Sequence, residues 1–99
     1  MLVCGDLPIP QQMCQAVHAA YESALHLGDK QNGVSSVVIC SVPDEADLLK
    51  AQFRIQESGT KTVLFREPDL GNRATAIATE QIDQASRKVL SRYPLWKGA

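Results

Sequence analysis

Short apolar runs alternate with segments of helical periodicity along this chain, and that alternation constrains the fold more than any other feature. The runs occupy residues 1–4, 34–42, 60–65 and 74–79, and the helical segments occupy residues 11–26, 45–57 and about 80–92. This order predicts an α/β fold of three layers, α/β/α, around a small mixed four-stranded sheet. Right-handed crossovers make the first three strands parallel, and we expect the fourth to run antiparallel.

The length of 99 residues fits one compact domain, residues 1–99. A formal net charge of −1 excludes the global basic composition of a dedicated nucleic-acid binder. The two halves differ, because residues 1–50 carry two lysines and six acidic residues (net −4), whereas residues 51–99 carry eight basic and five acidic residues (net +3). Such an asymmetry is more often an ordinary solvated surface than a basic patch on one face.

The first helical segment has an apolar stripe and a polar edge. We expect the stripe to face the core, and its members lie on one side of the helix through spacings of three and four residues: Met13, Val17, Ala20, Tyr21, Ala24 and Leu25. The polar edge holds Gln11, Gln15, His18 and Glu22. This edge is therefore the part of the helix that is open to chemistry.

The second helical segment carries clear start and stop signals. Asp44 is the expected N-cap, since its side chain can accept a backbone N–H of the first turn, and Gly59 is the expected stop. The predicted core stripe of this helix is Ala46, Leu49, Phe53 and Gln56, with Leu48 and Ile55 at its margin.

The other elements follow from local patterns. The continuous apolar run at 37–40 predicts a central strand, and it follows a polar break at 28–33. Thr79 is a candidate cap for a last helix, whose thin apolar face would comprise Ile82, Ala85, Ser86, Val89 and Leu90. In the tail that follows, packing of Trp96 onto its own core is slightly favoured over a role as an anchor for a partner.

The three cysteines, Cys4, Cys14 and Cys40, form no Cys-x-x-Cys pair and lie in apolar sequence, so we interpret them as reduced core residues. Residues 1–10 lack the pattern of a signal peptide, and no run of 18 apolar residues is present. We therefore expect a soluble cytoplasmic protein with no membrane partner. Because metal-ligand spacings and nucleotide-binding motifs are also missing from the sequence, we expect no metal and no cofactor.

Two polar clusters are candidates for chemistry. His18 is a proton carrier near neutral pH, one turn after Gln15, although a lone helical histidine is more often a packed, hydrogen-bonded residue. The second cluster is the loop at 66–73, where Asp69 and Gly71 fit an Asx-turn with a positive φ at the glycine. Alternatively, the Asp69 carboxylate faces a pocket at the end of a strand.

With these residues identified, the chain resembles the type 2 peptidyl-tRNA hydrolases over almost its whole length. The resemblance rests on Asp6-Leu7, on Gln15-Ala-Val-His18-Ala-Ala, on the run VICSVPDE at 38–45, on Asp69-Leu-Gly71 and on Thr75-Ala-Ile-Ala. Each motif is weak alone, and their order and spacing carry the assignment. The resemblance implies a mixed four-stranded sheet with helices on both sides, and hydrolysis of the ester that joins a peptide to tRNA.

The resemblance also implies roles for individual residues. Gln15, His18, Asp69 and Thr75 match the positions of the catalytic site. Our mechanistic hypothesis is that water is activated near His18 or Asp69, that Gln15 holds the ester carbonyl, and that Arg66 or Arg73 supplies the positive charge of the missing lysines. The residues that would contact substrate or RNA are Gln11, Arg66, Gly71 and Arg73. Peptidyl-tRNA is the implied partner, and a homodimer stays open as an assembly.

The chain departs from the family at two places. The family's Gly-Lys-Gly-Lys stretch is replaced by Pro-Ile-Pro-Gln at 8–11, so Gln11 occupies the position of a lysine, and Arg73 stands where the family has a threonine. A neutral amide cannot replace an ammonium group against a phosphate. The alternative function is therefore a non-catalytic tRNA- or protein-binding module that keeps the fold, and a third is a subunit anchored to its partner through the tail at 95–96.

Overall fold

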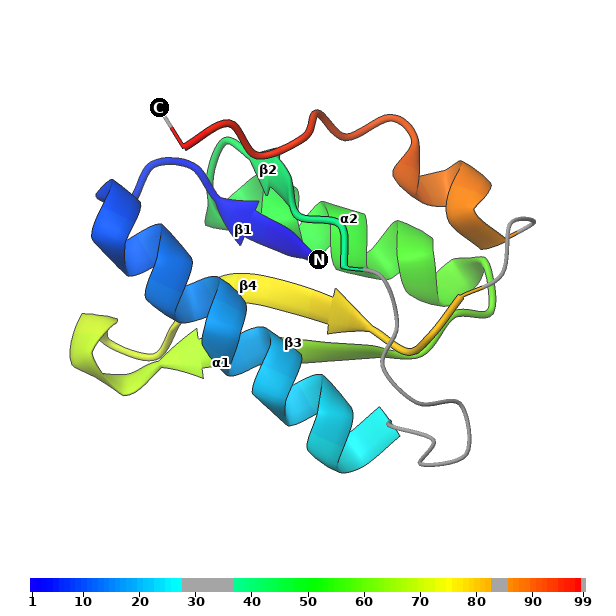
Figure 1. The fold of residues 1–99 in the computed structure, drawn as a ribbon, viewed down its shortest axis with the longest axis horizontal. Helices are drawn as coiled ribbons and strands as arrows, with labels where there is room; N and C mark the ends of the chain where they lie inside the picture. The colour runs from blue at the N-terminus through cyan, green and yellow to red at the C-terminus, as the bar shows by residue number, and fades with distance from the viewer. Residues whose placement is uncertain (28–36, 83–85, 99) are drawn as a thin grey trace.

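The structure is a computed structural model that describes residues 1–27, 37–82 and 86–98. The described elements, in chain order, are β1 (Leu2–Cys4), α1 (Ile9–Leu27), β2 (Cys40–Val42), α2 (Glu45–Glu57), β3 (Thr62–Glu67), η2 (Pro68–Leu70), β4 (Arg73–Thr79) and η3 (Ser86–Leu90). In this part of the chain, two α-helices and a mixed four-stranded sheet form a small α/β fold (Figure 1).

The strands lie in the order β2-β1-β4-β3. β1 and β2 are parallel, with Leu2 opposite Cys40, whereas β4 is antiparallel to both of its neighbours, β1 and β3. The first three strands therefore share one direction and the fourth opposes them, as predicted. The polar break at 28–33 lies outside the described residues.

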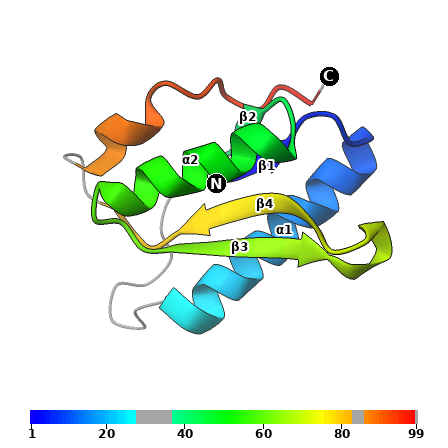
Figure 2. The same ribbon diagram turned by 180° about the vertical axis from the view of Figure 1, so that it is seen from behind.

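The two faces of the sheet belong to two apolar clusters, because successive side chains of a strand point to opposite sides. Leu2 and Cys4 of β1 pack in one cluster with Leu48 and Ile55 of α2. Val3 packs in the other with Ala19 of α1 and with alanines of β4. Accordingly, Figures 1 and 2 show α1 and α2 on opposite sides of the sheet.

The core stripe predicted for α1 is wrong. The helix extends a little beyond the predicted range, and its large apolar side chains, Met13, Val17, Tyr21 and Leu25, are all more than half exposed. Its buried face consists of Gln12, Gln15, Ala16 and Ala19. The sheet surface below α1 contains Ala76 and Ala78, so the helix approaches it through small side chains and through amides that find hydrogen-bond partners there.

In α2 the predicted bounds and cap are confirmed, but the predicted core stripe is not. The Asp44 carboxylate accepts the backbone N–H of Asp47 at 3.0 Å, and Gly59 follows the helix at φ +93°. The buried residues are Leu48, Ala51 and Ile55, while Leu49 and Phe53 are exposed. The predicted stripe thus lies roughly 150° around the helix from the buried face, since neighbouring positions differ by about 100°.

The run at 37–40 does not form a central strand. β2 begins at Cys40, lies at the edge of the sheet, and leaves Val37 and Val38 exposed. The C-terminal tail covers this edge, because the Ser41 N–H donates to the Pro94 carbonyl at 2.9 Å and the Trp96 N–H donates to the Ile39 carbonyl at 2.8 Å. An apolar run that lacks alternation can thus lie at an edge when a tail segment covers it.

The predicted last helix is also not found where it can be checked. Ser86–Leu90 is a 3-10 turn, η3, and residues 83–85 of the predicted helix lie outside the described part of the chain. Val89 and Leu90 are partly buried and pack against the apolar cluster on the α2 side. The short turn η3 is therefore enough to bring these two side chains to the core. Of the cysteines, all free, Cys4 and Cys40 are buried as predicted but Cys14 is exposed on α1. No helix in the described segments is both long and apolar enough to span a bilayer.

Candidate functional site

Two side chains on the polar edge of α1 face the ends of β3 and β4. Gln15 is almost fully buried, at 4% exposure, whereas the His18 side chain, one turn later, is half exposed. The Gln15 amide nitrogen donates to Oε2 of Glu67, the last residue of β3, at 3.1 Å. Its amide oxygen accepts from the Thr75 hydroxyl at 2.8 Å. Both ends of the Gln15 amide are therefore occupied within the protein.

Thr75 reaches Gln15 because β4 contains a bulge at this point. Phe65 pairs with Ala76 and the next residue, Arg66, pairs with Ala74, so Thr75 has no residue opposite it on β3. A bulge re-aims the side chain of the extra residue. Here it gives a fully buried threonine whose hydroxyl donates to the amide of α1.

His18 lies at the exposed end of this cluster. Its Nδ1 is 3.8 Å from Oε2 of Glu67, and its ring lies against Phe65 with centroids 4.6 Å apart and planes tilted by 49°. A carboxylate on that side favours the tautomer with the proton on Nδ1, which leaves Nε2 as the basic nitrogen. The Glu67 side chain is only 12% exposed, so water screens this pair incompletely.

The turn after β3 holds the Glu67 carboxylate from its other side. Oε1 of Glu67 accepts the backbone N–H of Asp69 at 3.4 Å, and Gly71 closes η2 at φ +68° with its N–H on the Pro68 carbonyl at 3.3 Å. The positive φ predicted for Gly71 is confirmed. Asp69 itself is exposed, and within the described segments its carboxylate bonds to none of the other residues of the cluster.

In the described part of the chain, Arg66 and Gln11 make no described contact with His18. Arg66 is exposed and donates through Nη1 to the Asn72 carbonyl at 3.2 Å, which braces the turn. Gln11 is exposed in the first part of α1. Thus the structure joins Gln15, His18 and Thr75 in one cluster, but not Gln11, Arg66, Gly71 or Arg73.

Arg73 forms an ion pair with Asp6. This pair links the start of β4 to the loop after β1. Partial burial acts to lower the pKa of Arg73, but hydrogen bonds with Asp6 and with the Cys4 thiol outweigh it, so the pKa lies above its ordinary value. Burial also raises the pKa of the Cys4 thiol, and the neighbouring Arg73 only partly opposes this. Arg73 is therefore a tethered cation.

Sequence reasoning missed Glu67, whose carboxylate contacts both Gln15 and His18. It was assigned to the loop at 66–73, whereas β3 continues through it. The available signal was period-two alternation, because Phe65 and Glu67 lie two residues apart on one strand and both contact His18.

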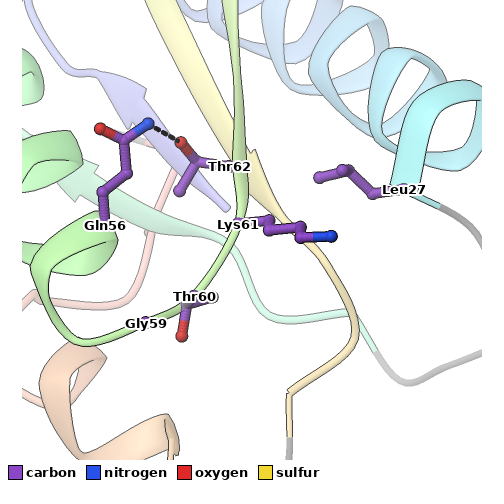
Figure 3. Close-up of a pocket in the computed structure, with 6 residues that line it drawn as sticks. All are labelled: Leu27, Gln56, Gly59, Thr60, Lys61 and Thr62. Carbon is purple, nitrogen blue, oxygen red and sulfur yellow. Dashed lines mark hydrogen bonds between the residues drawn. The ribbon is translucent and has the colours of Figure 1, made fainter.

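Two surface hollows lie away from this cluster. One hollow is lined by Leu27, Gln56, Gly59, Thr60, Lys61 and Thr62, where the Gln56 amide donates to the Thr62 hydroxyl at 3.1 Å (Figure 3). A second lies by the loop after β1, with Gln12, Trp96 and Lys97 among its lining residues. Neither hollow includes Gln15, His18 or Glu67. In the described part of the chain, no three His, Cys, Asp or Glu side chains are grouped closely enough to hold a metal ion.

Comparison with models of known protein families finds no match for this chain, and a search of curated proteins finds no significant relative. The resemblance to the type 2 peptidyl-tRNA hydrolases therefore rests on the sequence motifs alone, and everything that depends on it is a proposal.

Proposed function

We propose that this chain is a divergent member of the type 2 peptidyl-tRNA hydrolase family and hydrolyses the ester between a peptide and tRNA. The observation that carries the proposal is the cluster in which Glu67 contacts both Gln15 and His18 and in which Thr75 bonds to Gln15. Gln15, His18 and Thr75 are three of the four residues that the resemblance assigns to catalysis. The proposal includes the family's three-layer arrangement, supported by the separate apolar clusters of α1 and α2, and a cytoplasmic site of action.

In the proposed mechanism His18 is the general base. Nε2 takes a proton from a water molecule, whose oxygen attacks the carbonyl carbon of the ester. The tetrahedral intermediate then collapses, the bond from carbon to the ribose oxygen breaks, and the proton on Nε2 passes to that leaving oxygen. The Glu67 carboxylate, 3.8 Å from Nδ1, favours the required tautomer and stabilises the imidazolium that forms.

Gln15 and Thr75 act as positioning residues in this mechanism. The Gln15 amide is bonded at both ends, so it orients Glu67 rather than holding the ester carbonyl as the sequence hypothesis had it. The exposed Asp69 carboxylate, one short turn after Glu67, is the second group available to bind the attacking water.

Contacts to the tRNA phosphates would come from the exposed Arg66, with Gln11 as a neutral contact on α1. Arg73 would have to give up its ion pair with Asp6 before it could bind a phosphate. Gly71 keeps the turn at 68–72 compact, and this presents Arg66 and Asp69 on one loop.

The direct test is cleavage of N-acetylaminoacyl-tRNA at low salt by the wild-type chain and by His18→Ala. We expect the variant to lose about 100-fold to 10,000-fold in kcat, the usual range for a general base. His26→Ala is the matched control, since His26 is an exposed histidine of the same helix and pairs with Glu22. Equal rates for wild type and His18→Ala would refute the assignment of His18.

The alternative, a non-catalytic tRNA- or protein-binding module, is favoured by one observation: the His18 side chain is half exposed and lines neither of the two hollows. A binder without turnover should hold deacylated tRNA at low salt and release it steeply as salt rises. Its affinity should fall on Arg66→Gln and stay unchanged on His18→Ala, which separates the two functions.

A further inference from the structure

The basic residues of this chain are concentrated in two short segments. Residues 48–57 and 86–92 together carry five cations and one carboxylate, that of Glu57, which gives a net charge of +4. Because the whole chain carries −1, its other residues together carry −5. The five cations lie on α2 and in or just after η3: Lys50, Arg54, Arg87, Lys88 and Arg92.

These two segments lie side by side in the fold. α2 contacts η3, and both views of the ribbon show η3 beside the C-terminal half of α2 (Figures 1 and 2). Val89 and Leu90 of η3 pack against the same apolar cluster that contains Leu48 and Ile55 of α2. The core therefore holds the two basic segments together.

The two cations of α2 lie on the flank of the helix that is turned toward η3. The Gln52 and Gln56 amides donate to the Thr62 hydroxyl of β3 at 3.4 and 3.1 Å, so that flank of α2 faces β3. At about 100° per residue, Lys50 and Arg54 lie on the opposite flank. The strand order β2-β1-β4-β3 puts this flank on the β2 side of the sheet, where η3 lies.

None of the five cations is neutralised by another described residue. All five side chains are exposed, and within the described segments none of them forms a hydrogen bond or an ion pair. Arg73 and Arg66 differ, since the first pairs with Asp6 and the second donates to the Asn72 carbonyl. Neighbouring uncompensated cations attract an anionic partner.

Exposed apolar side chains adjoin these charges. Phe53 is 62% exposed and Leu49 is 37% exposed, one turn apart on the outer side of α2. Each precedes a cation, Arg54 and Lys50 respectively, so apolar and basic groups alternate on this side of the helix. Aromatic residues together with arginine are enriched in protein interfaces.

We propose that this surface, formed by the five cations with Leu49 and Phe53 and called the α2–η3 surface below, binds an acidic and partly apolar segment of another protein. Carboxylates of the segment would pair with the cations, and an apolar side chain would pack on Phe53. Three of the five cations are arginines, whose guanidinium groups can each hold a carboxylate through two parallel hydrogen bonds.

A short acidic segment fits this surface better than RNA does. The charge of −5 on the rest of the chain repels a long polyanion that extends beyond the surface, whereas a short segment meets only the local charge of +4. The α2–η3 surface and α1, which carries His18, lie on opposite sides of the sheet (Figures 1 and 2). The proposal is therefore independent of the hydrolase activity.

The first test is fluorescence anisotropy with a labelled peptide of four Glu-Glu-Phe repeats in about 50 mM salt. We expect saturable binding that the double variant Arg54→Glu, Arg87→Glu weakens by at least about 10-fold. The matched control, Lys61→Glu with Lys97→Glu, makes the same change in net charge at two exposed lysines outside the surface and should change the affinity by less than about 2-fold. Circular dichroism should show the same fold for both double variants.

Three outcomes would overturn the proposal. They are absence of binding by the wild-type chain at 300 μM, equal weakening by the two double variants, and equal affinity for an uncharged peptide of Gln-Gln-Phe repeats. The first rejects the surface as a binding site, the second reduces it to an effect of net charge, and the third removes the role of the carboxylates.

The apolar part and the class of partner have their own tests. Phe53→Ser should weaken binding of the Glu-Glu-Phe peptide by about 3-fold to 10-fold, whereas Tyr21→Ser, at an exposed aromatic residue of α1, should leave it unchanged. Equal effects of the two substitutions would contradict the contact at Phe53. A single-stranded RNA of twelve uridines should bind at least about 10-fold more weakly than the peptide. RNA that binds as tightly as the peptide would overturn the assignment to an acidic protein segment.

Discussion

The two helices on either side of the sheet bury opposite kinds of residue. α2 buries the large apolar side chains of Leu48 and Ile55, whereas α1 buries two glutamines and two alanines. Burial of a polar amide is tolerated only when its hydrogen bonds are satisfied, and the α1 glutamines are bonded to Glu67, Thr75, Trp96 and backbone carbonyls. Of the two helices, α2 thus buries the larger apolar side chains, and α1 organises polar groups.

The largest effect on stability should come from α2. Leu48→Ala removes a side chain with no exposure and should lower the free energy of unfolding by about 2–5 kcal/mol, through lost burial and the cavity left behind. Leu49→Ala, next along the helix at 37% exposure, should cost much less. Urea denaturation measures both, and equal losses would contradict the assigned inner face of α2.

The buried amide of α1 should give the next largest effect. Gln15→Leu leaves the buried Thr75 hydroxyl without its acceptor and should cost about 1–3 kcal/mol of unfolding free energy. Gln11→Leu, at an exposed position of the same helix, should be nearly neutral. Adding Thr75→Val to Gln15→Leu should recover part of the loss, since no orphaned hydroxyl remains. A strictly additive double variant would argue against the Gln15–Thr75 bond.

A smaller effect should come from the turn that holds Glu67 toward α1. Gly71→Ala forces an L-residue to φ +68° and should cost about 1–2 kcal/mol. Space around the glycine is not the cause, because an added Cβ would meet no atom within 4 Å. Gly5→Ala, where φ is not positive, separates steric contact from backbone strain. An unchanged urea midpoint for Gly71→Ala would remove the strain argument.

The smallest effect is a pH dependence of the unfolding free energy that comes from the thiol of Cys4, in the cluster on the α2 side. The exposed thiol of Cys14 on α1 serves as its control. Because burial in the folded state raises the pKa of Cys4 above its ordinary value of 9.0, the folded chain holds a proton that the unfolded chain loses. The resulting stability is complete below pH 9 and is lost as the pH rises toward the folded pKa. Unfolding measured from pH 8 to 10 should show this decline, and Cys14→Ser should not change it. A flat profile would contradict the shift.

Local signals in the sequence predicted much of this fold. The Asp44 cap, the bounds of α2, the positive φ of Gly71 and the strand directions each depend on a few neighbouring residues or on a general rule of connection. The buried faces of the helices do not. The periodicity of Met13, Val17, Tyr21 and Leu25 identifies a stripe, but only the alanine-rich surface of β4 determines which side of α1 can approach the sheet.

The candidate site shows the same division. Gln15 and His18 were accessible from their spacing, whereas Glu67 enters through the length of β3 and Thr75 through a bulge that depends on the pairing of β3 with β4. Pairing between strands is a non-local property, and a change of one residue in register reverses the face of every side chain.

The tail at 94–96 protects an edge of the sheet from aggregation with other molecules. It bonds along the outer edge of β2, and the Trp96 indole donates to the Gln12 side chain at 2.7 Å, which ties the tail to α1. An uncovered strand edge presents unpaired N–H and C=O groups, to which a strand of another molecule can pair. The hydrogen bond of the indole thus holds the tail in place. A chain truncated before Pro94 would expose the edge of β2 and become prone to fibrous aggregation.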